Sequence, residues 1–234
     1  MPDVDRVINL IARAEQSGVS LRIVGSVAVQ LYALSSKAGT KRPDDPKDID
    51  LVGLKADHQR IQHFLFGEGW KLDKNLLLFA EDRETYESKE AGYTIDVFFD
   101  HVDGSHPIEL KSRLGCHGPA VRPEDLLLTK LQRQFLRSAD IWDCCILLDA
   151  LEEDTDLTFY RRLLSSNWGL YTTVLDNLEF LAHECDGETR SIALLIEAAT
   201  SAKKSWTWKA RALLGRHVKW WKEVYDADGG RQGQ

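Results

Sequence analysis

The spacing of apolar residues near the start of the chain predicts a helix, a strand and a second helix. Apolar side chains recur at helical spacing over residues 3–17, at Val4, Val7, Ile8, Ile11 and Ala14. Gly18 follows at the position where a helix C-cap is expected. The run L-R-I-V at 21–24 predicts a strand that stops at Gly25, and the sequence from Ser26 onward is again helical. Gly25 and Ser26 therefore form a predicted strand-to-helix turn.

A polar segment separates this turn from the next strand. Residues 36–47, S-K-A-G-T-K-R-P-D-D-P-K, contain two prolines, a glycine and alternating charges, which predict an exposed loop. Strand character resumes at Asp48, and a helix is expected at about 57–66. Further strand-like runs are W-K-L, N-L-L-L-F-A and G-Y-T-I-D-V-F-F, at 70–72, 75–80 and 92–99. We expect these runs to be neighbouring strands of one sheet.

From Pro123 onward the pattern is helical. Pro123 suits the first position of a helix, and the apolar spacing continues through D-I-W-D-C-C-I-L-L-D-A-L. Further helices are expected at about 157–166, 168–183, 187–202 and 206–225. The pattern predicts an α+β chain with a small mixed sheet flanked by helices over residues 1–120, followed by a helical module over residues 121–234.

Composition and charge limit the classes of function that the chain can have. The chain has 234 residues, 43% of them apolar, so it can bury a core. Its net charge of -7 argues against nucleic acid binding by bulk electrostatics. A local basic stretch at 203–222 nevertheless interleaves lysines and arginines with four tryptophans. Such a stretch suits an RNA acceptor, or it is a terminal amphipathic helix whose tryptophans pack on the helical module. We expect the second.

The cysteines and the apolar runs indicate where the protein acts. Four cysteines form no C-x-x-C pair, and Cys144 and Cys145 are adjacent, which predicts a reduced chain. No segment approaches the roughly 18 uninterrupted apolar residues of a membrane span, and the N-terminus lacks a signal-peptide pattern. We therefore expect a soluble, cytoplasmic protein without a membrane partner.

Two carboxylates mark the strand that begins near Asp48. Asp48 and Asp50 lie two residues apart and therefore point to one face, where their repulsion calls for a cation. Mg²⁺ prefers one or two carboxylates together with phosphates and waters. Asp96 interrupts a second apolar strand and would complete a two-metal site. The alternative is that D-x-D is an incidental pair at an exposed strand end.

The Gly25-Ser26 turn supplies a second kind of chemistry. A glycine at a strand end allows close backbone approach, and a serine that opens a helix adds a hydroxyl to free amide donors. These groups suit a phosphate. An ordinary turn with an N-cap is the alternative.

In this order, Gly25-Ser26, helix, loop, Asp48-Ile49-Asp50-Leu51 and then Asp96, the chain resembles the polymerase-beta type nucleotidyltransferase superfamily. The resemblance implies that the acids hold two Mg²⁺ ions and that the G-S turn grips the nucleotide's phosphates. One departure is that 21 residues separate Ser26 from Asp48, about twice the spacing usual in the superfamily. Loop extension has a small entropic cost, so the fold tolerates it. Alternatively, the longer loop marks a changed acceptor site or a lost activity.

The segments P-E-D-L-L-L-T-K-L-Q and D-I-W-D-C-C-I-L-L resemble the helical part of bacterial nucleotidyltransferase-like proteins, including the abortive-infection, type IV toxin branch. The resemblance implies that Lys130 neutralises triphosphate charge and that Asp140 or Asp143 orients Lys130 or the acceptor. It also implies that the helical module closes the nucleotide cleft. Alternatively, Lys130 is a solvated lysine, and Asp140 and Asp143 are an N-cap and first-turn acids.

Two other groups of reactive residues have simpler explanations. His101, Asp103 and His106 lie in D-H-V-D-G-S-H, which we interpret as a polar turn after a strand rather than a metal site. Cys116 and His117 are adjacent, which rarely gives the geometry of a catalytic dyad.

These features predict a nucleotidyltransferase that moves a nucleoside monophosphate from an NTP to a hydroxyl of RNA, protein or a small molecule, with tRNA or a protein as candidate acceptors. Asp48 and Asp50 would bridge two Mg²⁺ (or Mn²⁺) ions, and Asp96 would ligate the metal that activates the hydroxyl. Gly25, Ser26, Lys130 and Asp143 would bind the nucleotide. The alternatives are a non-catalytic nucleotide- or partner-binding module, or the toxin of a toxin-antitoxin pair with an antitoxin-like partner protein.

Overall fold

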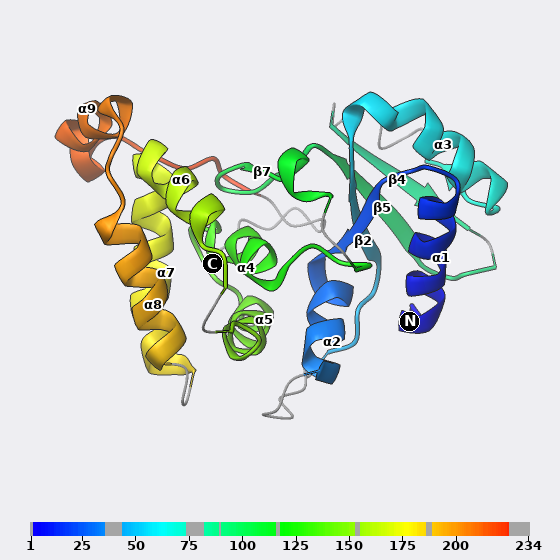
Figure 1. Cartoon of the computed structure of the whole chain (residues 1–234), viewed down its shortest axis with the longest axis horizontal. Helices are drawn as coiled ribbons and strands as arrows, with labels where there is room; N and C mark the ends of the chain where they lie inside the picture. The colour runs from blue at the N-terminus through cyan, green and yellow to red at the C-terminus, as the bar shows by residue number, and fades with distance from the viewer. Residues whose placement is uncertain are drawn as a thin grey trace. The chain divides into compact units, whose positions relative to one another are not determined.

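The structure is a computed structural model that describes residues 2–35, 44–73, 82–88, 90–115, 118–152, 155–185 and 189–224. The chain divides into two compact units. Among the described residues, unit 1 comprises those of 2–34, 44–102 and 109–122, and unit 2 comprises Ser35 and those of 103–108 and 123–224. Figure 1 labels the elements of each unit along the chain.

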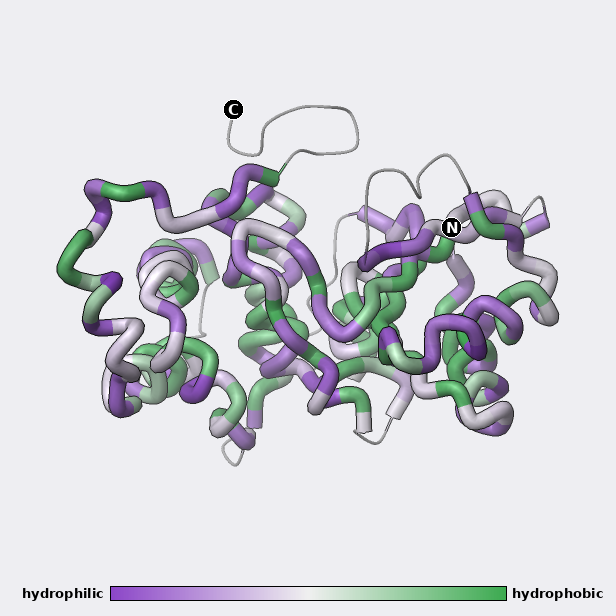
Figure 2. The backbone as a smooth tube through the Cα atoms, turned by 90° about the horizontal axis from the view of Figure 1, so that it is seen from above, coloured by the Kyte–Doolittle hydropathy of each residue, from purple (hydrophilic) through white to green (hydrophobic). Residues whose placement is uncertain are grey.

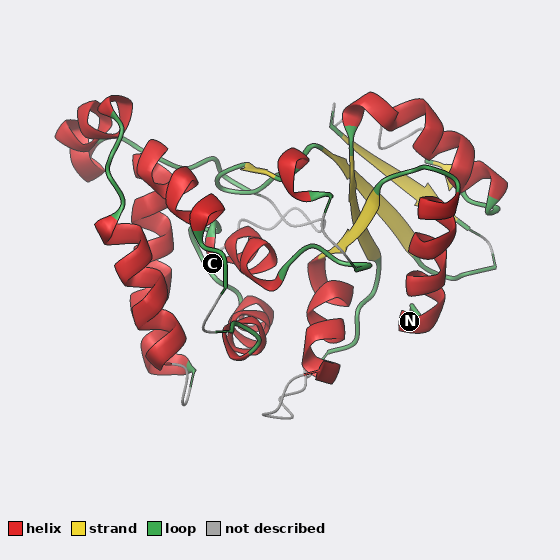
Figure 3. Cartoon of the chain, in the orientation of Figure 1, coloured by secondary structure: helices red, strands yellow, loops and turns green. Residues whose placement is uncertain are grey.

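A five-stranded mixed sheet forms the centre of unit 1. Its order is β1-β2-β5-β4-β3, and its strands are β1 (Leu21–Val24), β2 (Ile49–Gly53), β3 (Lys71–Leu72), β4 (Arg83–Glu87) and β5 (Thr94–Phe99). Strands β2 and β5 run parallel, whereas the other neighbouring strands are antiparallel. Figure 3 shows these strands in yellow with helices beside them. The predicted small mixed sheet is confirmed.

Within the described part of unit 1, three α-helices pack beside this sheet: α1 (Val4–Gln16), α2 (Gly25–Ser35) and α3 (His58–Gly67). The Asp3 side chain caps α1 by accepting a hydrogen bond from the backbone N–H of Asp5. A Cβ at Gly53 of β2 would lie 2.6 Å from Cδ1 of Ile61 in α3. Helix α3 therefore packs closely on the face of β2 to which position 53 points. Residues alternate along a strand, so Asp50 points to the opposite face.

The short elements of this region are η1 (Lys55–Asp57), η2 (Lys111–Arg113) and a separate two-stranded sheet of β6 (His101–Val102) and β7 (Ile108–Glu109). Strand β4 was not predicted from the sequence. The predicted strand at 75–80 and most of the predicted loop at 36–47 lie outside the described residues, as do Cys116 and His117.

Unit 2 is helical, as predicted. Its helices are α4 (Pro123–Leu131), α5 (Ser138–Asp149), α6 (Thr158–Ser166), α7 (Trp168–Glu184), α8 (Thr189–Ser201), α9 (Trp206–Leu214) and η3 (Gly215–His217). Helix α7 contacts α4, α5, α6, α8 and α9 and is the centre of the packing. In Figure 2 hydrophobic and hydrophilic stretches alternate along the helices, as amphipathic elements require. Within the described residues, no helix combines the length and the apolar character that crossing a bilayer needs.

The last predicted helix is shorter than expected. It ends at Leu214 instead of about residue 225, because Gly215 adopts a positive φ of 54°. The expectation that the tryptophans pack on the helical module holds in part. Trp208 contacts Tyr171, and Trp220 contacts Trp168 edge to face. Trp206, however, is 80% exposed.

A disulfide joins Cys145 of α5 to Cys185 at the end of α7, so the prediction of a reduced chain was wrong. Adjacent residues on a helix point about 100° apart, so Cys145 faces Cys185 while Cys144 remains a buried thiol. Burial raises the pKa of the Cys144 thiol. Adjacency of two cysteines therefore does not prevent one of them from pairing elsewhere.

Candidate active site

Strands β2 and β5 bring Asp50 and Asp96 together. In the parallel pairing of these strands, Asp50 is the register partner of Asp96. Paired residues of neighbouring strands point to the same face of a sheet, so both carboxylates project from one side. Asp48 lies in a bend directly before β2, two residues ahead of Asp50. Asp50 and Asp96 therefore share one face of unit 1, and a place for Asp48 on that face stays a prediction.

Gly25 lies directly against Asp50. Val24 ends β1 and pairs with Asp50 across the antiparallel strands, and α2 begins at the next residue. A Cβ at Gly25 would lie 2.0 Å from Oδ2 of Asp50, and the glycine has a φ of 65°. Both features require glycine. The predicted Gly25-Ser26 turn and the predicted acid pair are thus in contact.

The N-terminus of α2 opens at this turn. The first N–H groups of a helix lack intrahelical partners, and the helix dipole favours negative charge there. The first turn of α2 contains no acidic residue, and the half-buried Ser26 adds a hydroxyl. This end of α2 can therefore bind a phosphate group.

Asp96 is fixed by two donors from β4. It is buried, with 3% of its surface exposed. Thr85 Oγ1 donates to Asp96 Oδ1 at 2.5 Å, and Arg83 Nη2 donates to Asp96 Oδ2. Thr85 is the register partner of Asp96 in the β4–β5 pairing. Asp96 is thus held on the β4 side, whereas Asp50 is packed on the side of β1 and α2.

Sequence reasoning missed Arg83 and Thr85. Both lie in R-E-T-Y-E of β4. This segment lacks the apolar alternation of a strand, because the buried position 84 holds a glutamate instead of an apolar residue. Glu84 accepts hydrogen bonds from Gln62 and Tyr86 and pairs with His58 Nε2 at 2.7 Å. The i, i+2 spacing of Arg83 and Thr85 identifies them only once the strand and its register are known.

The acids suit a divalent cation whose coordination is completed by phosphates and waters. Within the part of the chain that the structure describes, no three His, Cys, Asp or Glu side chains gather as a metal site. Mg²⁺ at nucleotide sites is held by one or two carboxylates and completed by phosphates and waters. Asp50 supplies such hard oxygens beside the Gly25 turn, and Asp48 lies two residues before it in the sequence. These two residues fit a nucleotide-bound Mg²⁺ or Mn²⁺, whereas Asp96 is already paired with Arg83.

Lys130 and Asp143 meet inside unit 2. Lys130 of α4 is 8% exposed, and its Nζ lies 2.8 Å from Asp143 Oδ2 and 3.7 Å from Asp140 Oδ1. Burial alone raises the pKa of Asp140, but Arg133, Lys130 and Arg137 outweigh it and hold this pKa below its ordinary value. The alternative of a solvated Lys130 is wrong. Asp140 also accepts from the Arg137 backbone N–H in a capping box, so it is a first-turn acid of α5, whereas the N-cap is Arg137.

His106 lies in the bend that follows β6, as the predicted turn after a strand requires, but its side chain is buried. It is 4% exposed, its Nε2 lies 3.0 Å from Thr173 Oγ1, and its backbone N–H donates to Gln132. Burial lowers the pKa of His106 to about 4. The imidazole is therefore neutral at pH 7 and belongs to the interior of unit 2.

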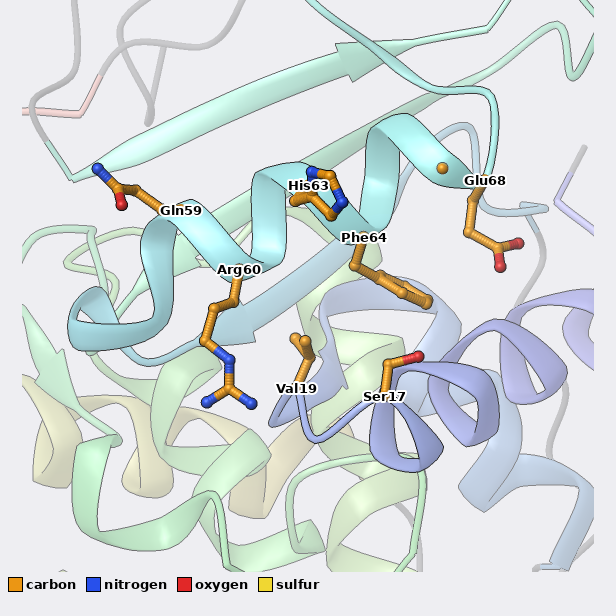
Figure 4. A pocket seen from close by; sticks show the side chains of 8 residues that line it. Ser17, Val19, Gln59, Arg60, His63, Phe64 and Glu68 are labelled. Carbon is orange, nitrogen blue, oxygen red and sulfur yellow. The ribbon is translucent and has the colours of Figure 1, made fainter.

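A pocket of about 670 Å³ lies at the other end of β1 and β2. Figure 4 shows Phe64 and Arg60 of α3 directed toward Val19, which precedes β1, and Ser17, which follows α1. Val19 lies before the first residue of β1, whereas Gly25 follows its last residue. The strand therefore separates this pocket from the Gly25–Asp50 contact, and we place the candidate active site at the acids.

No family model matches the chain, and no curated protein matches it in sequence. Among solved structures, the chain is similar to the lincosamide antibiotic adenylyltransferase LnuA with lincomycin bound, with a TM-score of 0.46 and 15% identity over 63% of this chain and 97% of that chain. It is also similar to the solution structure of the antibiotic-resistance factor ANT(2'')-Ia, with a TM-score of 0.41 and 12% identity over 92% and 96%. It is similar as well to the crystal structure of ANT(2'')-Ia in complex with adenylyl-2''-tobramycin, with a TM-score of 0.35 and 14% identity over 85% of this chain and 97% of that chain. The function proposed below rests on the residues of this chain.

Proposed function

We propose that this chain is a nucleotidyltransferase of the polymerase-beta type, which transfers a nucleoside monophosphate from an NTP to an acceptor hydroxyl and releases pyrophosphate. The observation that carries the proposal is the contact between Gly25 and Asp50. It joins a phosphate-binding helix end to a carboxylate whose register partner is a second carboxylate, Asp96. Neither an incidental D-x-D pair nor an ordinary turn accounts for all three residues at one edge.

Asp48 and Asp50 would hold the divalent cation, Mg²⁺ or Mn²⁺, together with the nucleotide. When bound, this cation would neutralise phosphate charge and favour ionisation of the attacking hydroxyl. The backbone N–H groups of Gly25 and Ser26, with the Ser26 hydroxyl, would bind the β and γ phosphates. These contacts orient the α phosphate for in-line attack.

In the transfer, the acceptor oxygen forms a bond to the α phosphorus while the bond from that phosphorus to the β-bridging oxygen breaks. Pyrophosphate leaves with the bridging oxygen and its electron pair. Asp96 would accept the proton that the hydroxyl loses, which requires one of its oxygens to exchange its present donor for the acceptor. The roles of Lys130 and Asp143 at the nucleotide stay predictions, as does a metal-ligand role for Asp96.

The test is transfer of label from α-³²P NTPs, each with Mg²⁺ or Mn²⁺, to total tRNA, to proteins and to hydroxyl-bearing small molecules. The double variant Asp48→Asn/Asp50→Asn should lose the label, because it removes the charge and keeps the shape. Asp57→Asn is the matched control, since Asp57 pairs with Arg60 on α3. Equal labelling by the wild type and the double variant would contradict the proposal.

A non-catalytic nucleotide-binding module is the second candidate, because both oxygens of Asp96 already accept hydrogen bonds from the protein. Calorimetry with ATP separates the two: binding without turnover of any NTP supports the module. The toxin role, the antitoxin-like partner and the cytoplasmic location stay predictions. Growth arrest on expression, and its loss in Asp48→Ala, would tie a toxin role to the acids.

A further inference from the structure

Arg83 is directed at Asp96 by the register of β4 and β5. Arg83 pairs with Phe98 across these strands, and Thr85 pairs with Asp96. Residues of one parity share a face, so Arg83 and Thr85 of β4 lie on the same side as Asp96 and Phe98 of β5. The Arg83 guanidinium reaches its diagonal neighbour Asp96, which is within the range of a long side chain.

Phe98 fixes the direction of this arginine. The guanidinium carbon of Arg83 lies 5.1 Å from the centroid of the Phe98 ring, a distance at which cation–π attraction operates. The Arg83 side chain is 45% exposed, whereas that of Asp96 is 5% exposed. Arg83 is therefore a half-exposed cation, held by an aromatic ring, that neutralises a buried carboxylate from the solvent side.

The same carboxylate is the one that the proposed reaction needs. Asp50 and Asp96 are register partners, so their like charges would destabilise each other unless a cation intervened. Without a metal ion, Arg83 neutralises the Asp96 member of this pair from the β4 side. A divalent ion that approached Asp96 would meet the positive guanidinium and would have to replace its hydrogen bond.

We propose that Arg83 is a displaceable counter-ion of Asp96, a positioning residue that competes with divalent cations for this carboxylate and so sets the affinity of the site for metal. The inference rests on the proposed function. Arg83 orients Asp96 in the resting protein, and it releases Asp96 when a triphosphate offers the guanidinium another anion. Thr85 remains on Oδ1 in both states and preserves the orientation of the carboxylate.

The experiment measures Mn²⁺ binding to the full chain without nucleotide at pH 8, by electron paramagnetic resonance of free Mn²⁺. The variant Arg83→Met keeps an unbranched side chain over Phe98 and removes the charge. Its Mn²⁺ dissociation constant should fall by about tenfold, which corresponds to the loss of one charge-assisted hydrogen bond. Arg83→Lys keeps the positive charge, so its Mn²⁺ dissociation constant should stay close to the higher value of the wild type. A purely structural role of Arg83 would not predict this difference between Met and Lys.

The matched control is Arg60→Met, because Arg60 is another half-exposed arginine of unit 1 that pairs with an aspartate, Asp57, at 3.2 Å. It should leave Mn²⁺ affinity unchanged.

Equal affinities of wild type and Arg83→Met for Mn²⁺, or no Mn²⁺ binding by either protein, would overturn the inference. Failure of the proposed function looks different: Mn²⁺ would then bind equally well to wild type and to Asp48→Asn/Asp50→Asn. Binding by Arg83→Met alone would support the inference.

Discussion

The Asp50 carboxylate occupies the space that a side chain at Gly25 would need, with Oδ2 2.0 Å from the position of a Cβ. Gly25→Ala should therefore disturb both residues. The positive φ of 65° alone costs an L residue about 1–2 kcal/mol, and the clash must move either the turn or the carboxylate. We expect transfer activity to fall by about 100-fold, since a displacement of about 1 Å costs that much.

Gly67→Ala is the control for this substitution. Gly67 ends α3, and a Cβ there would meet no atom within 4 Å. This variant should keep full activity and a free energy of unfolding close to that of the wild type, measured by urea denaturation. Wild-type activity in Gly25→Ala would show that the Gly25–Asp50 contact has no role in the reaction.

The buried ion pair of unit 2 makes a second prediction. Lys130→Met removes the cation from Asp143, which is 0% exposed and 2.8 Å away. Removing one partner of a buried ion pair destabilises a protein by about 3–5 kcal/mol, so the free energy of unfolding should fall by about that amount. Lys111→Met is the matched control, because the Lys111–Asp100 pair is largely exposed on the lysine side and such pairs contribute about 0–1 kcal/mol. Similar losses in the two variants would refute a buried pair.

The double variant Lys130→Met/Asp143→Leu sharpens that test. Removing both charges replaces the pair by apolar side chains, which is often less destabilising than removing one partner. The double variant should therefore be more stable than Lys130→Met alone in urea. If the loss of stability in the double variant equalled the sum of the losses in Lys130→Met and Asp143→Leu, the two charges would not interact.

The disulfide makes a third prediction. Cys145 and Cys185 are separated by 40 residues, and closing a loop of that length stabilises the folded state by about 4 kcal/mol in the chain-entropy treatment. Dithiothreitol should lower the free energy of unfolding of the wild type, measured with urea, by up to that amount and leave that of Cys145→Ser/Cys185→Ser unchanged. Peptide mapping without reductant should recover the Cys145–Cys185 peptide pair; recovery of both thiols free would contradict it.

Much of the fold follows from periodicity, and the exceptions have physical causes. Helices α1 and α4 and strands β1 and β5 have regular apolar spacing, so the sequence alone locates them. Strand β4 escaped because its buried Glu84 is stabilised by partners that lie far away in the sequence, His58 and Gln62. No local pattern reveals such partners.

The candidate site shows the same division. Gly25, Asp50 and Asp96 were predicted from the sequence because a glycine that ends a strand and carboxylates within apolar strands stand out from their neighbours. Arg83 was not, because its relation to Asp96 depends on the β4–β5 register and not on any motif. The disulfide likewise depends on how α5 meets α7, which the spacing of cysteines cannot show.

The buried imidazole of His106 predicts how stability depends on pH. Burial lowers its pKa to about 4 in the folded protein, against about 6.5 in an unfolded chain. Between these values the unfolded state binds more protons, so stability rises with pH. The contribution is fully present above about pH 6.5 and is lost as pH falls toward 4, by about 3 kcal/mol in all.

Urea unfolding of the wild type and of His106→Gln at pH 7.5, 6.5, 5.5 and 4.5 checks this dependence. The difference in unfolding free energy between the two proteins should shrink steadily below pH 6.5, because glutamine does not titrate. Asp140 does not interfere: burial raises its pKa, but Arg133, Lys130 and Arg137 hold it below its ordinary value, which places its protonation at lower pH. The exposed His63→Gln variant controls for loss of an imidazole. A difference that stays constant across this range would show that His106 is not buried as a neutral ring.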